Sequence, residues 1–415
     1  MYELFFVLSL ILFSGFAANI IFERTRISPV LVLMALGFVL GPMLRVVDSS
    51  SGSALAGLAP FIGALALIIM LFDGGLSLPL FQLIRTIPKA VAFTLLTFLL
   101  TLVGVSLFVH FAMGWDLLSG LLLGAALGGT SSAIVIALVE KSRAGAEARH
   151  LLTLESTITD ALCIISAIVI IQIIVAKVNI EPVAVLGLLA SAFSVAIVAG
   201  LVASIAWLFI LRRLAQKNLM YMLTLAAILL LYAMVEAAGG NGAISVFVFG
   251  LVLGNAKRIS SALGLSSVYQ LDRRIADFQA EATFFTRTFF FVYLGMIMDL
   301  DGLTWALAAV SIALLAIFYL ARRLSLRALL PATSDASFIA WMMPRGLAAA
   351  VLAGLPAASG IAIPGFVELT FTAIILTNVA ATIGQFGMGK PPAAAPAPAG
   401  RHANEKMRGK EKKRA

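Results

Sequence analysis

The sequence predicts an all-α polytopic membrane protein with about thirteen transmembrane helices. The 415-residue chain is 61% hydrophobic and only 12% charged, and its mean hydropathy of +1.07 is far above that of an ordinary soluble domain. Apolar runs of roughly 17 to 25 residues, the length that crosses a bilayer as a helix, recur along nearly the whole chain. The one cysteine, Cys163, lies inside such a run, which excludes a disulfide framework.

The apolar runs define the predicted spans. In chain order these lie at about 3–22, 27–44, 54–72, 88–112, 116–139, 150–176, 183–211, 219–238, 241–255, 275–298, 303–321, 337–358 and 363–386. The first span begins without a basic region and without an Ala-x-Ala site, so we interpret it as a retained helix and not as a signal peptide. The span at 241–255 is short and could be re-entrant, which would leave twelve.

Basic residues orient the spans, because cytoplasmic loops carry the excess of lysine and arginine. With the N-terminus outside and the C-terminus inside, most of the 29 Lys and Arg residues fall in inside loops or in the tail. The outside loops then contain only Arg45 and Lys177, while Arg287 and Arg345 fall within spans. An even number of spans would destroy this asymmetry. The charges therefore favour thirteen spans with a cytoplasmic C-terminus. We expect the protein to lie in a cell (inner) membrane.

The last residues, 389–415, differ from the rest of the chain. Lys390 is followed by a stretch of proline and alanine and then by a charged run that ends in Lys-Lys-Arg-Ala. Proline and alanine without periodicity cannot build a core, so this segment is predicted to be a disordered, basic cytoplasmic tail. It could bind anionic lipid or act only as a solvated topology anchor. The net charge of +9 does not require a nucleic-acid partner.

Two predicted spans contain features that interrupt a regular helix. The span at 116–139 contains Gly-Gly-Thr-Ser-Ser at 128–132, and glycine and hydroxyl residues lower helix propensity. The span at 337–358 contains Pro-Arg-Gly at 344–346, where proline removes a helix hydrogen bond. These spans are seven apart and so run in opposite directions, which is typical of the crossing helices of inverted transporter repeats. Tight helix packing is the alternative explanation for the glycines and serines. The residues predicted at the crossing are Gly129, Ser131, Pro344 and Gly346.

Two carboxylates, Glu155 and Asp160, lie inside the otherwise apolar run at about 151–176. A charge at the bilayer centre costs roughly 2.5–3.5 kcal/mol on insertion scales, so such residues indicate ion or proton pathways. Counting about 1.5 Å per residue from the span ends places Thr130, Asp160 and Arg345 near the midplane. Carboxylate, hydroxyl and carbonyl oxygens suit small, hard cations, and a partly desolvated carboxylate also retains protons. The sequence therefore predicts one site that a cation and a proton use alternately.

Glu155 requires a partner of its own, because it lies about 140° around the helix from Asp160. An unpaired buried charge would destabilise the protein by several kcal/mol, on the order of the loss measured when a buried pair is broken. Arginines near the midplane are the available partners. No resident cofactor is predicted; the only metal expected at Asp160 is the transported monovalent cation.

Several short motifs occur in a characteristic order. These are Glu155-Ser156-x-x-Thr159-Asp160, Phe-Phe-Phe-Val-Tyr-Leu-Gly at 289–295, Ala321-Arg322 and Pro344-Arg345-Gly346. Together with thirteen predicted spans, they resemble the monovalent cation/proton antiporters of the NhaP and sodium–proton exchanger type. The resemblance implies a transmembrane domain over 1–388 with a core or transport part at about 88–176 and 303–387. It also implies a dimer or scaffold part at about 1–72 and 183–298, a homodimer, and a role in pH homeostasis.

The resemblance also implies a role for each site residue. The implied ion- and proton-binding residues are Asp160, Ser156, Thr130 and Thr159. Glu155 is implied to pair with an arginine. Arg322 is the first candidate and Arg345 the second, although the predicted end of the span at 321 places Arg322 at the cytoplasmic surface.

Two positions differ from the pattern of the family. Thr159 stands where the family usually has asparagine, and Thr-Ser-Ser at 130–132 stands where it often has Thr-Asp-Pro. The second difference is more like the potassium-coupled relatives. The neutral residue at 159 fits the electroneutral branch, which exchanges one proton for one monovalent cation. The choice between Na+ and K+ stays open.

Other charged residues receive structural interpretations. Asp73 and Glu236 each end a predicted span before a pair of small residues, so we expect both at membrane interfaces. Arg287 is expected to pair with a nearby acid. Glu281, near the start of a span, either attracts cations or stabilises the helix N-terminus. Glu368 is a weaker candidate for the ion path.

Three other functions are alternatives to the antiporter. An intramembrane protease would need a nucleophile with a base, or paired aspartates, and the sequence has no mid-span histidine and no partner aspartate expected at the depth of Asp160. An enzyme is therefore not expected. A cation channel would need a selectivity filter, and no filter-like repeat occurs. A cation-coupled symporter or organic-solute carrier of similar architecture is the remaining alternative.

Overall fold

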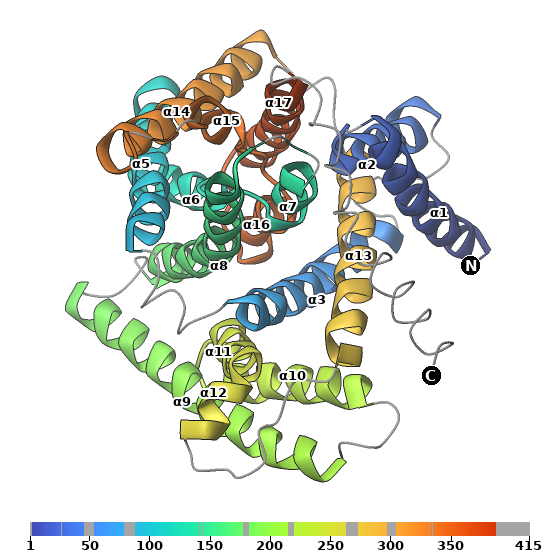
Figure 1. Ribbon diagram of the computed structural model, residues 1–415, viewed down its shortest axis with the longest axis vertical. Coiled ribbons are helices and arrows are strands. Elements are labelled where there is room, and N and C mark those ends of the chain that lie inside the picture. Colours follow the sequence, from blue (N-terminus) through green and yellow to red (C-terminus); the bar gives the residue numbers. More distant parts are fainter. Residues whose placement is uncertain are drawn as a thin grey trace, which may run out of the picture.

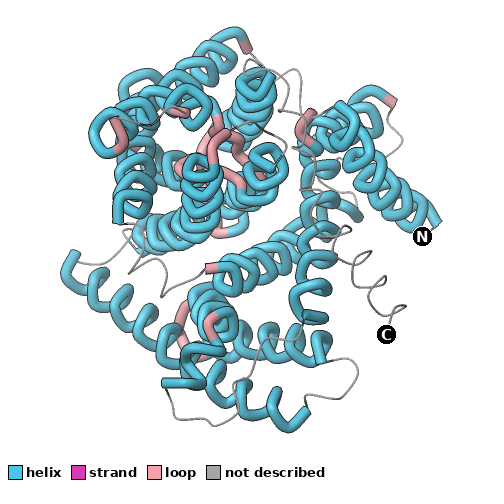
Figure 2. Tube along the Cα trace, in the orientation of Figure 1, coloured by secondary structure: helices cyan, strands magenta, loops and turns pink. Residues whose placement is uncertain are grey.

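The computed structural model describes residues 2–25, 27–44, 54–78, 88–140, 142, 144–176, 182–214, 220–262, 273–296, 304–331, 333 and 335–386. Throughout these residues the chain forms helices joined by loops, and none of them belongs to a strand (Figure 2). The predicted all-α class is confirmed for them. Helices suit so apolar a chain, because a bilayer offers no partners to backbone N–H and C=O groups. The predicted tail at 389–415 lies outside the described residues.

The helices follow the predicted spans closely. The first part of the chain forms α1 (Tyr2–Thr25), α2 (Pro29–Phe38), the π-helix η1 (Val39–Met43), α3 (Ala54–Ser77), α5 (Pro88–Met113), α6 (Leu117–Ala126), α7 (Ser132–Glu140) and α8 (Ala146–Ala176). The second part forms α9 (Pro182–Leu214), α10 (Met220–Ala237), α11 (Gly242–Gly254), α12 (Ala256–Ala262), α13 (Arg273–Met296), α14 (Trp305–Leu329), α15 (Ala336–Trp341), α16 (Leu347–Ala358) and α17 (Phe366–Phe386). Two helix ends differ most from the prediction: α3 continues to Ser77 instead of ending at 72, and α14 continues to Leu329 instead of 321.

Seven helices in the described part are long and apolar enough to cross a membrane. These segments are Leu8–Thr25, Pro88–Met113, Ala146–Ala176, Ala190–Leu211, Met220–Ala237, Trp305–Leu329 and Phe366–Gly384. Shorter apolar helices lie between them, and α6 and α16 are two of these. The pair α6 and α7 falls within one predicted span, and the pair α15 and α16 falls within another.

The helices form two groups that lie side by side (Figure 1). In the first group, α5 packs against α6 and α14, α8 packs against α6 and α7, and α14 packs against α17. In the second group, α11 packs against α3 and α9, and α13 packs against α1 and α2. The groups meet where α3 contacts α8 and α16, where α13 contacts α16, and where α2 contacts α17.

Glycines allow the second group to pack closely. Gly75 of α3 lies against the backbone of α11, and Gly250 of α11 lies against the backbone of α3. Gly37 of α2 and Gly295 of α13 face each other in the same way. A Cβ at any of these four positions would collide with backbone atoms of the neighbouring helix. In a bilayer the hydrophobic effect does not drive helices together, so they associate largely through close van der Waals packing, which small residues allow.

Candidate ion-binding site

The segment that connects α6 to α7 touches the segment that connects α15 to α16. Helix α6 ends at Ala126 and α7 begins at Ser132, while α15 ends at Trp341 and α16 begins at Leu347. The backbone N–H of Ser131 donates to the carbonyl of Pro344 over 2.9 Å. Gly346 lies against the Ser131 side chain so closely that a Cβ would overlap it. The non-helical segments therefore satisfy part of each other's backbone hydrogen bonding, which buried non-helical backbone requires.

Asp160 projects from α8 to this junction. Its Oδ2 accepts hydrogen bonds from the backbone N–H of Ser132, over 3.1 Å, and from the Ser132 hydroxyl, over 2.6 Å. Ser132 is the first residue of α7, so the carboxylate meets the positive end of a helix dipole. Asp160 is partly exposed, unlike the fully covered residues beside it on α8. One carboxylate oxygen is thus held in place, and no described residue donates to the other.

Thr159 supports the interrupted backbone. Its hydroxyl accepts from the N–H of Thr130 over 3.1 Å and lies 3.3 Å from the carbonyl of Ser156, to which it can donate. The Ser156 hydroxyl is buried and donates to the Thr153 carbonyl in its own helix, over 3.1 Å. The Thr130 hydroxyl is buried and has no hydrogen-bond partner. Of the predicted hydroxyl ligands, Thr130 is therefore the one whose oxygen is left unused.

Glu155 forms an ion pair with Arg322 of α14. Both guanidinium Nη atoms contact the carboxylate, Nη2 lying 2.9 Å from Oε2, and Arg322 Nε donates to the carbonyl of Ile339 over 2.9 Å. Glu155 and Arg322 are each 1% exposed. The predicted position of Arg322 at the cytoplasmic surface is wrong, because α14 extends beyond residue 321 and carries Arg322 into the protein interior. The first of the two candidate arginines is the one that pairs with Glu155.

Arg345 instead bonds to the segment between α6 and α7. Its Nη1 donates to the carbonyl of Gly129, and its guanidinium lies over the ring of Phe318, 4.4 Å from the centroid. The backbone N–H of Arg345 donates to the Thr377 hydroxyl over 3.1 Å, and its backbone carbonyl accepts from the side-chain amide of Asn378 over 2.8 Å. A buried arginine is commonly stabilised by a cation–π contact and by hydrogen bonds to carbonyl oxygens. Arg345 therefore joins the α15–α16 connection to the α6–α7 connection and forms no hydrogen bond or ion pair with Glu155.

Some residues near the site were not predicted. Ser132 was noticed only as part of the Thr-Ser-Ser segment, and nothing in the sequence assigned it to Asp160. No sequence pattern points to Asn378, yet its Oδ1 accepts from the hydroxyl of Ser28, the residue before α2, over 2.7 Å, and its Nδ2 donates to the Arg345 carbonyl. Its signal was an amide side chain inside the predicted span at 363–386.

The other charged residues lie in different surroundings. Asp73 lies within α3, four residues before its last residue, Ser77, and not at the predicted end of a span. Glu236, at the end of α10, is exposed and accepts from the Gly242 N–H over 2.8 Å. Arg287 pairs with no acid among the described residues. Its guanidinium carbon lies 5.9 Å from the centroid of the Phe284 ring.

Comparison with known proteins places the chain in a family. A family model described as "Sodium/hydrogen exchanger, transmembrane" matches residues 8–392. The chain belongs to this family. Membership confirms the resemblance drawn from the motifs, and it makes the chain a multi-pass membrane transporter and not an enzyme. Ions are the substrates of such a protein.

Two curated relatives of this exchanger family match over most of the chain. The Na(+)/H(+) antiporter 1 of Methanocaldococcus jannaschii is 28% identical over 305 residues, which is 71% of this chain and 68% of that protein. The K(+)/H(+) antiporter NhaP of Alkalimonas amylolytica is 25% identical over 314 residues, which is 72% of this chain. The match spans about half, 51%, of the length of the second relative.

Solved structures of an exchanger from the same archaeon share the fold. The sodium proton antiporter MjNhaP1 from Methanocaldococcus jannaschii at pH 8 superposes with a TM-score of 0.76, at 24% identity, over 92% of this chain and 99% of that chain. A second MjNhaP1 structure, from electron microscopy, gives a TM-score of 0.68 at 23% identity, over 92% and 94% of the two chains. The fold is therefore that of MjNhaP1.

Proposed function

We propose that this exchanger trades one monovalent cation, Na+ or K+, for one proton by alternating access, with Asp160 as the shared binding site. One observation carries the proposal. Asp160 is joined to Ser132 at the first residue of α7, where the two interrupted helices meet. A carboxylate at such a junction is placed to bind a cation and to be exposed to either side as the junction moves.

The oxygen atoms around Asp160 support cation binding. Oδ1 of Asp160 accepts from no described residue, and the hydroxyl oxygen of Thr130 is buried and unpartnered. The Ser156 hydroxyl, one helical turn before Asp160, donates to its own helix and keeps its lone pairs. Hard oxygen donors of this kind suit Na+ and K+. Thr159 supports the site indirectly in this proposal, because its hydroxyl accepts a hydrogen bond from the backbone N–H of Thr130 and so fixes that backbone.

The charges near Asp160 support electroneutral exchange. Glu155 is neutralised by Arg322, and residue 159 is an uncharged threonine. Asp160 then carries the one exchangeable negative charge of the junction. Because a proton and a monovalent cation each cancel one charge, the loaded site has the same charge in both half-cycles.

The arrangement of the chain in the membrane is part of the proposal. Thirteen spans in two inverted repeats, with the N-terminus outside and the C-terminus in the cytoplasm of a cell (inner) membrane, make the α6–α7 and α15–α16 pairs the crossing helices. The transport part, at about 88–176 and 303–387, then moves against a scaffold at about 1–72 and 183–298. The scaffold forms the homodimer, and lipid surrounds both. The separation of the helices into two groups supports this division (Figure 1).

The test is exchange in reconstituted liposomes that contain a pH-sensitive dye. After an imposed proton gradient, addition of Na+ or K+ is expected to restore the dye signal, at a rate that does not change when the membrane potential is clamped. Asp160→Asn is expected to abolish exchange while the protein keeps its elution volume and helix content. Recovery that requires an organic solute together with the cation would instead support the symporter.

A further inference from the structure

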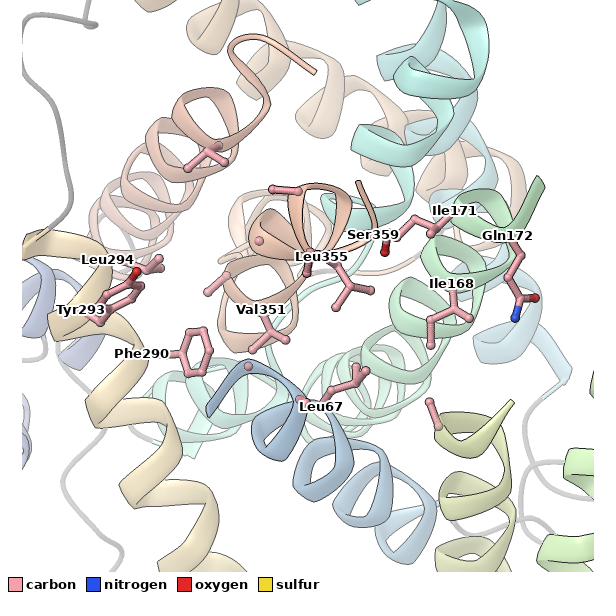
Figure 3. Close-up of a pocket in the computed structure, with 18 of the residues that line it drawn as sticks. Leu67, Ile168, Ile171, Gln172, Phe290, Tyr293, Leu294, Val351, Leu355 and Ser359 are labelled. Carbon is pink, nitrogen blue, oxygen red and sulfur yellow. The ribbon is translucent and has the colours of Figure 1, made fainter. Parts of the chain in front are cut away.

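A cavity of about 670 Å³ lies between the two helix groups, away from the crossing (Figure 3). Its walls come from α3 and α13 of one group and from α8, α16 and α17 of the other, and α10 and α11 complete it. It lies at the end of the bundle where α8, α10 and α16 end and α11 begins. In the proposed topology this end faces outward.

The cavity has polar groups suited to a cation. Glu236 supplies a carboxylate, and no described lining residue is basic. The Gln172 side-chain oxygen is buried without a hydrogen-bond partner. Tyr232 lies one helical turn before Glu236 on α10 and supplies a hydroxyl, and Ser359 supplies a second one. A cleft lined by one sign of charge concentrates ions of the opposite sign.

Apolar side chains separate the cavity from the crossing. Leu67, Ile168 and Val351 line it from three helices and are only 5%, 7% and 3% exposed. Figure 3 shows Val351 on α16 between the helix of Ile168 and that of Phe290. Ile168 follows Asp160 by about two turns of α8, or roughly 12 Å at 1.5 Å per residue. Val351 lies in the second turn of α16, directly after the interruption. Such apolar constrictions stop ions because a hydrated ion cannot shed its water there.

We propose that this cavity is the outer vestibule of the ion path, with Leu67, Ile168 and Val351 as its gate. Glu236 and Gln172 attract and hold a partly hydrated monovalent cation there before the gate opens. The inference rests on the proposed function and topology, and it adds a second cation station to them. Glu236 contributes the charge, and the free carbonyl oxygen of Gln172 replaces part of the hydration shell.

A purely structural role for Glu236 makes a different prediction. Its Oε1 accepts from the Gly242 N–H and so caps the start of α11. Glu236→Gln keeps a side-chain acceptor for that N–H and removes only the charge. A capping role therefore predicts no change in transport for the glutamine variant, whereas a cation station predicts weaker binding from outside.

The experiment compares right-side-out and everted membrane vesicles. Glu236→Gln is expected to raise the apparent KM for the cation at the outer face about tenfold at low ionic strength, the lower end of what a charge-lined cleft supplies. Inert salt is expected to shrink this difference by screening, and the KM at the inner face is expected to stay the same. Asp116→Asn is the matched control, because Asp116 is also an exposed carboxylate that caps a helix, and it lies outside the cavity. An unchanged outer KM, or equal changes at both faces, would overturn the proposal.

A labelling experiment separates failure of this inference from failure of the proposed function. Ser359→Cys places a thiol at the exposed rim of the cavity, and the native Cys163 is buried. A membrane-impermeant thiol reagent is expected to label the variant from outside only, measured as a mass shift that needs no transport. Labelling from inside only would overturn both the vestibule and the topology. Labelling from outside with a normal outer KM in Glu236→Gln would leave the exchanger intact and refute the cation station.

Discussion

Replacing Glu155 by glutamine tests the buried ion pair that links α8 to α14. Glu155 and Arg322 are each 1% exposed, and the carboxylate receives both Nη groups of the arginine. Removing one partner of a buried pair costs about 3–5 kcal/mol, because the other charge stays buried without compensation. Arg322 keeps its bond to the Ile339 carbonyl, so we expect the loss to lie near the lower limit, about 3 kcal/mol.

The assay is unfolding of detergent-purified protein, by heat or denaturant, for the two single variants and their combination. Glu155→Gln and Arg322→Met should each unfold much earlier than the wild type. The double variant should regain most of the loss, since it leaves no uncompensated charge, and the difference measures the coupling. Arg323→Met is the control, because Arg323 is the next residue, is only partly buried and contacts the Tyr319 ring. Single variants as stable as the wild type, or a double variant whose losses simply add, would refute the reasoning.

Three further predictions address the junction and its occupancy. Gly346→Ala should slow exchange strongly, because the added Cβ overlaps the Ser131 side chain. A second change, Ser131→Gly, should restore part of the exchange rate. Gly354→Ala is the control and should leave the exchange rate unchanged, because a Cβ there meets nothing within 4 Å. Thr159→Val should lower the free energy of unfolding by about 1–3 kcal/mol, because it leaves the Thr130 N–H unpaired. The control is Thr157→Val, since the Thr157 hydroxyl bonds only within its own helix. Equal losses in the two variants would contradict this role of Thr159. Lowering the pH in the liposome assay should raise the apparent KM for the cation, by up to about tenfold per unit, because proton and cation compete for one carboxylate; a KM independent of pH would argue for separate sites.

The positions of the helices could be predicted because long apolar runs have one stable form in a membrane. The errors came where charged residues were taken to mark helix ends. The predicted end at 321 stopped at Arg322, and the predicted end at 72 stopped at Asp73. In the structure both residues lie inside helices. Arg322 is tolerated there because Glu155 neutralises it, and a sequence alone does not reveal a partner that lies 167 residues away.

The site could be predicted in part. The spacing of Glu155 and Asp160 predicts that they face different neighbours, and they do: one meets Arg322 and the other meets Ser132. The choice between Arg322 and Arg345 could not be made, because it depends on how α14 and α16 pack against α8. The same holds for Ser132, since a shift of one residue turns a helical side chain by about 100°.

The most direct test of the central claim is proton release on cation binding. Purified protein in weakly buffered detergent solution, titrated with Na+ or K+, should release one proton for each cation bound at a pH where Asp160 is protonated. Asp160→Asn should bind no cation and release no proton, and Asp73→Asn should leave the release at one per cation. Release of a proton by the Asp160→Asn variant, or cation binding by the wild type without any release, would contradict the account.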